Sequence, residues 1–160
     1  MSGQNYKTQN TKHKKTRVAE VQGEEDFSWG DDVDDAVLCE DAAKYNGSGK
    51  VYDLEERTAI FGERVIRLCK KIPRHPANDR INGQLAGAGT SLGANYVEAT
   101  ERLSRRDFRA IISRCVKETK ETRFFLRMLA AAEPSLKIEA RDLYREASEL
   151  LRIFGSMYQK

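Results

Sequence analysis

Six cationic residues recur along one stretch of the chain at spacings of three, four or eight. They are Arg105, Arg109, Lys117, Lys120, Arg123 and Arg127. On a helix, which turns by 100° per residue, these side chains and Ser113 fall within an arc of about 120°. A row of cations about 33 Å long can follow a phosphate backbone, and counterion release then makes affinity fall steeply with salt. This cationic row is the candidate nucleic-acid-binding site, for RNA or DNA.

Two other interpretations of the cationic row stay open. The first is a solvated helix face held by intrahelical ion pairs. Those pairs would be Arg114 with Glu118 and Lys117 with Glu121. In the second, the basic flank and the acidic flank of the helix face different neighbours in a head-to-tail ring. The apolar part of that interface would come from Phe124, Phe125 and Met128.

A second polar constellation precedes the cationic row. Ser91, Asn95 and Glu98 stand at positions i, i+4 and i+7, which share one face of a helix. They can hold a partner or a water molecule, but the pattern favours a hydrogen-bonded structural line that fixes the register of the helix.

Residue types that carry catalysis or bind metals are sparse and badly spaced. His13 and His75 have no carboxylate or nucleophile nearby in sequence, and no paired metal-binding motif is present. Cys39, Cys69 and Cys115 are far apart and odd in number, which favours buried small hydrophobes at the last two positions. The sequence therefore predicts no enzymatic activity, no cofactor and no metal site.

Charge divides the chain into two parts. Residues 1–19 carry five bases and no acid, residues 20–41 carry ten acids and no base, and residues 51–160 carry 21 bases against 15 acids. The first 50 residues lack helical or strand periodicity and predict a disordered tail. Around Trp29 this tail mixes apolar residues with acids, a composition found in short segments that fold against a protein partner, although a solubilising tether is the favoured interpretation. The basic flank of the domain at 51–160 can dock such acidic partners or the tail itself.

Four apolar patterns of period 3.6 follow the tail and predict four helices. They begin at the Asp53 cap, near Asn78, at the Ser104 cap and near Leu136, and breaks fall at Pro73 and Pro134. Short connections make neighbouring helices antiparallel, so we expect an all-α, up-down-up-down antiparallel four-helix bundle.

Glycine is concentrated in the second predicted helix, over 78–102. Gly83, Gly87, Gly89 and Gly93 each cost an isolated helix up to about 1 kcal/mol relative to alanine. Such residues require a tertiary reason, and the one we expect is close approach of neighbouring helices. A phosphate-binding loop is disfavoured because neither GxGxxG after a strand nor GxxxxGK[ST] occurs.

Several blocks of the chain, in order and at matching spacing, resemble one known family. The blocks are Gln84, Ala88, Ser91–Leu92, Asn95–Ala99, Ser104–Phe108, Lys117–Thr122 and Leu126–Leu129. They are similar to the four-helix bundle proteins encoded within 23S rRNA intervening sequences, over about residues 52–158. The family often has glycine where this chain has Ala99.

The resemblance implies a four-helix bundle that assembles into a homopentameric ring, with no established enzymatic activity. A more distant likeness, in fold only, is to the accessory variability determinant of diversity-generating retroelements, a basic pentamer that binds reverse transcriptase and nucleic acid. The chain shows no apolar run of membrane-spanning length and no secretory signal, so we expect a soluble cytoplasmic protein without membrane contact.

Overall fold

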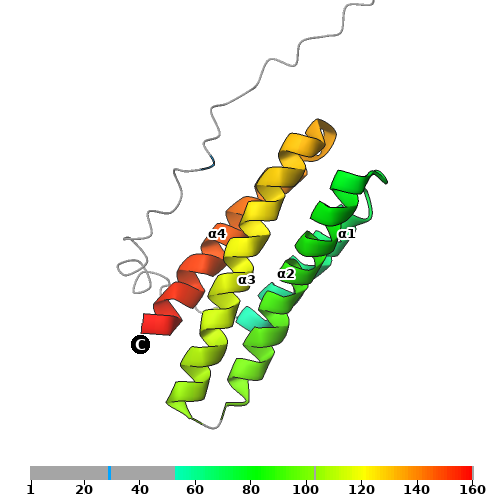
Figure 1. Ribbon diagram of the computed structural model, residues 1–160. Coiled ribbons are helices and arrows are strands. Elements are labelled where there is room, and N and C mark those ends of the chain that lie inside the picture. The colour runs from blue at the N-terminus through cyan, green and yellow to red at the C-terminus, as the bar shows by residue number, and fades with distance from the viewer. Residues whose placement is uncertain (1–28, 30–52, 103, 160) are drawn as a thin grey trace, which may run out of the picture.

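The computed structural model describes Trp29 and residues 53–102 and 104–159 of the chain. Four helices form the bundle, α1 (Leu54–Cys69), α2 (Pro76–Thr100), α3 (Arg105–Ala132) and α4 (Lys137–Gln159), with a short 3-10 turn η2 (Pro134–Leu136) before α4. Successive helices run in opposite directions (Figure 1). The predicted all-α four-helix fold is confirmed. The predicted disordered tail falls on residues outside those described, Trp29 excepted.

Side chains at the helix starts explain the boundaries. The Asp53 carboxylate accepts a hydrogen bond from the Glu56 amide at 3.0 Å, and the Ser104 hydroxyl accepts one from the Asp107 amide at 3.1 Å, so both predicted caps are confirmed. The second helix begins two residues earlier than predicted. There His75 Nδ1 accepts from the Ala77 amide at 3.3 Å, and Pro76 occupies the first turn, where its missing N–H is no loss.

The core consists of the apolar faces that the periodicity predicted. On α3 the buried residues are Ile111, Ile112, Cys115, Thr119, Thr122, Leu126, Leu129 and Ala130. Phe61 of α1 and Phe154 of α4 are among the largest side chains with almost no exposure. The buried threonines satisfy their hydroxyls within α3, since Thr119 donates to the Cys115 carbonyl at 2.6 Å.

Close approach of α1 and α2 accounts for some of the α2 glycines. A Cβ at Gly89 would lie 2.7 Å from Cγ1 of Val65, and one at Gly93 would lie 3.4 Å from Thr58. A side chain at Gly89 would therefore clash with α1. Gly83 and Gly87 differ, because a Cβ there meets nothing within 4 Å among the described residues. The packing reason predicted for all four glycines holds at Gly89 and Gly93.

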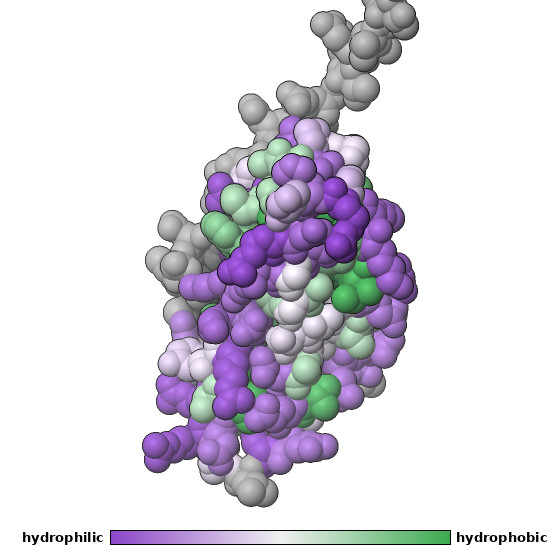
Figure 2. Space-filling model, turned by 45° about the vertical axis from the view of Figure 1, so that its right-hand side comes forward, coloured by the Kyte–Doolittle hydropathy of each residue, from purple (hydrophilic) through white to green (hydrophobic). Residues whose placement is uncertain are grey.

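A shallow groove of about 550 Å³ runs between α1 and α2. Its lining combines small and apolar residues with four charged ones. The first group includes Gly62, Ile66, Gly93, Ala94 and Val97, and the charged residues are Glu55, Glu63, Arg67 and Lys70. The face that Figure 2 turns forward carries pale and green residues between purple hydrophilic margins. We refer to the hollow between these two helices as the α1–α2 groove. None of the described helices is both long enough and apolar enough to cross a membrane.

Candidate nucleic-acid interface

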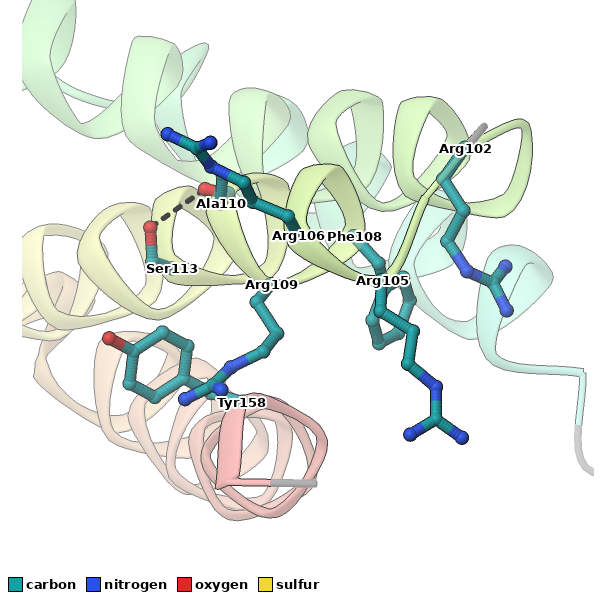
Figure 3. A pocket seen from close by; sticks show the side chains of 8 residues that line it. All are labelled: Arg102, Arg105, Arg106, Phe108, Arg109, Ala110, Ser113 and Tyr158. Atoms are coloured by element: carbon teal, nitrogen blue, oxygen red, sulfur yellow. Dashed lines mark hydrogen bonds between the residues drawn. The ribbon is translucent and has the colours of Figure 1, made fainter.

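The N-terminal part of α3, Arg102 in the α2–α3 connection and the C-terminal end of α4 line an open pocket of about 650 Å³. Its lining residues are Arg102, Arg105, Arg106, Phe108, Arg109, Ala110, Ser113 and Tyr158. Four arginines thus surround one hollow, which we call the basic pocket (Figure 3). Figure 3 shows Arg105 and Arg109 on the side of α3 that faces α4, whereas Arg106 points away from them.

Aromatic rings position two of the four guanidinium groups. The Arg109 guanidinium carbon lies 5.4 Å from the centre of the Tyr158 ring, and that of Arg102 lies 4.5 Å from the centre of the Phe108 ring. Such cation–π contacts orient a guanidinium and leave its N–H donors available. Arginines held in this way can present donors to a phosphate or carboxylate group.

The charge of the basic pocket is weakly compensated. Within the described part of the chain, Arg105, Arg106 and Arg109 make no ion pair. The acid of this turn, Asp107, accepts a 2.5 Å hydrogen bond from the Ser104 hydroxyl. The free amides and dipole of the α3 N-terminus add further positive potential. An anion entering the pocket would meet several unneutralised cations.

Farther along α3 the cationic row is exposed but less well defined. Lys117 and Lys120 both face solvent, and Lys117 Nζ lies 3.8 Å from a carboxylate oxygen of its sequence neighbour Glu118. The intrahelical pair considered for Arg114 is replaced by a contact between helices, because its Nη1 lies 3.4 Å from the Glu98 carboxylate on α2. The middle of the row thus keeps its charge at the surface.

The last two members of the row surround an aromatic site that involves Trp29. Arg123 Nη2 donates to the Tyr144 hydroxyl at 2.6 Å, and that hydroxyl donates to the Trp29 carbonyl at 2.5 Å. The Trp29 and Tyr144 rings meet edge to face with centres 5.0 Å apart. The guanidinium carbons of Arg127 and Arg141 lie 6.0 and 5.8 Å from the Trp29 ring. Arg123 is therefore turned toward α4.

The three residues of the predicted polar line, Ser91, Asn95 and Glu98, differ in their exposure and contacts. Ser91 and Asn95 are partly buried on α2, and Glu98 is exposed and pairs with Arg114. No hydrogen bond joins the three side chains among the described residues. The close approach on α2 is at Gly89, where an added Cβ would lie 2.7 Å from Val65, and Glu98 instead makes an exposed 3.4 Å contact with Arg114 of α3.

The buried cysteines match the prediction of small core hydrophobes. Cys69 and Cys115 are both buried free thiols. Burial raises the pKa of Cys69 to about 11 and that of Cys115 to about 12. Neither thiol is a nucleophile near neutral pH, because the thiolate is the reactive form. In the described part of the chain, no group of three or more histidine, cysteine, aspartate and glutamate side chains is arranged to hold a metal ion.

Comparison with known proteins assigns the bundle to a family. Residues 52–156 match the sequence model of the 23S rRNA-intervening sequence proteins. The chain belongs to this family. The match spans α1 to α4 up to Ser156 and leaves Trp29 outside it. None of the curated proteins matches the chain. The resemblance drawn from the sequence blocks is confirmed.

A solved structure has the same fold. It is a protein of unknown function of the S23 ribosomal protein family from Bacteroides thetaiotaomicron, with 23% sequence identity and a TM-score of 0.60. The similarity covers 67% of this chain and 99% of that chain. Neither the intervening-sequence family nor this structure is described by a reaction.

Two features of the candidate site are not predicted by the local sequence pattern of this family member. Arg102 lies before α3, and Arg106 lies about 100° around the helix from Arg105, so neither falls on the cationic row. The segment from Arg102 to Arg106 nevertheless held a signal, since three of its five residues are arginine. The pairing of Trp29 with Tyr144 joins positions 115 residues apart and left no local pattern.

Proposed function

We propose that this protein is a non-enzymatic accessory protein that associates with RNA or DNA, and that its contact surface consists of the basic pocket and the exposed members of the cationic row beyond it, Lys117, Lys120 and Arg127. The observation that carries the proposal is the gathering of Arg102, Arg105, Arg106 and Arg109 around one open hollow. Of these, Arg105, Arg106 and Arg109 lack ion pairs among the described residues.

Geometry and charge both support a polyanionic ligand. From Arg105 to Lys117 the row extends for twelve residues, a rise of about 18 Å, which is long enough to contact several phosphates. Arginine forks suit phosphate oxygens, and the rings of Phe108 and Tyr158 add aromatic surface to the pocket beside the guanidinium groups that they hold. The excess of 21 bases over 15 acids in residues 51–160 favours the same class of ligand.

Binding to labelled oligonucleotides across a salt series tests this proposal. We expect fluorescence anisotropy to show affinity for single-stranded RNA or DNA that falls as salt rises. The double variant Arg105→Gln with Arg109→Gln should weaken binding at low salt. If each arginine contacts one phosphate, the slope of log affinity against log salt should fall by roughly 1.4 for a single strand.

A matched control removes the same charge at the opposite end of the bundle. Arg74 and Arg80 lie in the α1–α2 connection and the first turns of α2, far from the basic pocket. Their double glutamine variant should bind like the wild type. Equal losses in both double variants would mean that net charge alone attracts the oligonucleotide, and the absence of any salt-dependent binding would remove the proposal.

The site at Trp29 favours a second candidate function, a scaffold that docks acidic protein segments. Its chemistry differs from that of the basic pocket, because a carbonyl acceptor and an aromatic ring are held together with cations. A segment that combines an aromatic residue with carboxylates suits this surface. Pull-down of an acidic tryptophan-containing peptide that survives the Arg105 and Arg109 substitutions would favour the scaffold over nucleic acid.

We also propose that the protein works as a head-to-tail ring of identical subunits, with five copies by family resemblance. Two different surfaces support this assembly, as a heterologous contact requires. One is the α1–α2 groove, and the other is the exposed Phe124 on α3, whose ring contacts Phe125 at a centre distance of 5.2 Å. The exposed members of the cationic row would then repeat around the ring and increase avidity for a long polyanion.

A further inference from the structure

We propose that Tyr144, Arg127 and Arg141 form a docking site for the chain's own Trp29, and that the docked acidic segment competes with nucleic acid for the cations of α3. Docking itself is independent of the proposed function, whereas the competition rests on it. The occupant is identified by a side chain that the structure places on the site.

Trp29 is held by a hydrogen bond, an aromatic contact and two nearby guanidinium groups. Tyr144 is 2% exposed, so its hydroxyl depends on protein partners. It accepts from Arg123 at 2.6 Å and donates to the Trp29 carbonyl at 2.5 Å. The partly buried Trp29 ring packs against the bundle core and lies near two guanidinium groups. Trp29 thus offers the site both a carbonyl acceptor and an aromatic ring.

The sequence around Trp29 explains why this occupant suits a basic surface. Seven acids and no base lie within six residues of Trp29, namely Glu24, Glu25, Asp26, Asp31, Asp32, Asp34 and Asp35. A chain extends at most about 3.6 Å per residue, so these residues stay within about 22 Å of Trp29. The nearest three, at two or three residues' distance, stay within about 11 Å, close to the screening length in physiological salt. Docking therefore concentrates carboxylates beside Arg123 and Arg127.

Competition with nucleic acid follows from this placement. Arg127 belongs to the cationic row and contacts Trp29, so a phosphate and the docked segment cannot use its guanidinium in the same way. The acids would also repel a polyanion passing along the row. If the segment is docked in nine of ten molecules, it lowers the apparent affinity about tenfold.

Emission from Trp29, the single tryptophan of the chain, tests docking in the full-length protein. We expect blue-shifted emission and weaker acrylamide quenching than for N-acetyl-tryptophanamide. Tyr144→Phe keeps the ring but removes the donor to the Trp29 carbonyl, and the loss of one hydrogen bond should weaken docking roughly two- to twelvefold. Arg127→Gln, at an exposed position, should also raise quenching.

The control Arg114→Gln removes the same charge from α3 about 20 Å from Arg127 and should leave emission unchanged. Far-UV circular dichroism identifies any variant that loses helix. Wild-type emission that matches the free indole derivative would overturn docking. So would equal quenching in all variants.

A complementation experiment separates docking within one chain from docking between copies. Tyr144→Phe subunits, which keep Trp29, are unfolded and refolded together with Trp29→Ala subunits, which keep Tyr144. Docking within one chain predicts emission equal to that of the Tyr144→Phe protein alone. Recovery of the blue shift would show that Trp29 uses a neighbouring copy and would overturn the assignment to its own chain.

Binding of a labelled single-stranded RNA then tests competition. Trp29→Ala should bind about tenfold more tightly than the wild type if the segment is docked nine-tenths of the time. Unchanged affinity in a protein with proven docking would overturn competition. If no variant binds RNA or DNA at any salt concentration, the proposed function fails, while the emission of Trp29 still decides docking.

Discussion

Arg109 and Arg123 come from the same row of α3 but have different surroundings. Arg109 lies 5.4 Å from the Tyr158 ring and is exposed, whereas Arg123 is partly buried and donates to the Tyr144 hydroxyl at 2.6 Å. The Arg123 Nε is buried without a hydrogen-bond partner among the described residues. Both arginines therefore lie on the same side of α3, and their contacts with the aromatic residues of α4 determine which of them keeps its N–H donors available to a ligand.

The two buried thiols predict how stability depends on pH. Burial raises the pKa values of Cys69 to about 11 and of Cys115 to about 12, from an ordinary value of 9.0. The unfolded chain therefore releases these protons first as pH rises above about 9, and the folded state loses relative stability from there toward pH 11 to 12. Urea unfolding from pH 8 to 11 should show this loss, with a shallower pH dependence in the Cys69→Ala, Cys115→Ala double variant.

Parallel pH profiles for the two proteins would contradict this account of the thiols. A chemical measurement complements the unfolding data. In a Cys39→Ser background, iodoacetamide should label the native protein far more slowly than the urea-unfolded protein, since the thiolate is the reactive form.

The second helix shows how one sequence pattern has two structural causes. Gly89 meets Val65 of α1, which is fully buried, whereas Gly87 meets nothing within 4 Å among the described residues. Gly89→Ala should lower the free energy of unfolding by about 1–3 kcal/mol because the added methyl group overpacks the contact with α1. Gly87→Ala should raise it by up to about 1 kcal/mol through helix propensity. Urea denaturation of both variants measures the difference.

A compensating substitution isolates the packing cause. Val65→Ala makes room for the new methyl group, so it should cost less in the Gly89→Ala background than in the wild type. Strictly additive costs would indicate that Gly89 is required for another reason. A destabilised Gly87→Ala would place an unrecognised neighbour at that position.

Helix existence and core faces were predictable because period, caps and prolines are local. Asp53 and Ser104 cap the helices as their side-chain chemistry requires, and the buried α3 positions recur mainly at the three- and four-residue spacings of an amphipathic helix. The α2 helix starts two residues before the predicted position near Asn78, because His75 caps it. Contacts between distant segments, such as Trp29 with Tyr144, depend on the assembled bundle and were beyond a reading of local patterns.

The bundle as a whole separates two kinds of surface. The basic pocket lies where α3 begins, and small, apolar and charged residues together line the α1–α2 groove. An ion pair joins α1 to α4 at Arg57 with Glu146, 2.6 Å apart, and another joins the α1–α2 connection to α4 at Lys71 with Glu139, 2.8 Å apart. The molecule therefore carries a groove of mixed lining between α1 and α2 and a basic hollow at the start of α3.

If the protein assembles as a ring, its two most exposed large apolar residues on α3 and α4 should differ in their effect on assembly. Phe124 on α3 is 54% exposed and Ile138 at the start of α4 is 77% exposed, but Phe124 alone adjoins the cationic row and a second aromatic ring. Light scattering should give a molar mass near five times the 18.2 kDa of one chain. Phe124→Ser should reduce that mass while keeping helix content, and Ile138→Ser should leave it unchanged, because a heterologous contact loses its aromatic residue only in the first variant. A wild-type mass of one chain would contradict the ring, and equal loss of mass in both serine variants would contradict the role of Phe124.

A smaller assembly should also bind a long RNA less tightly than the ring does while binding a short oligonucleotide equally well, since avidity requires several linked copies of the basic pocket.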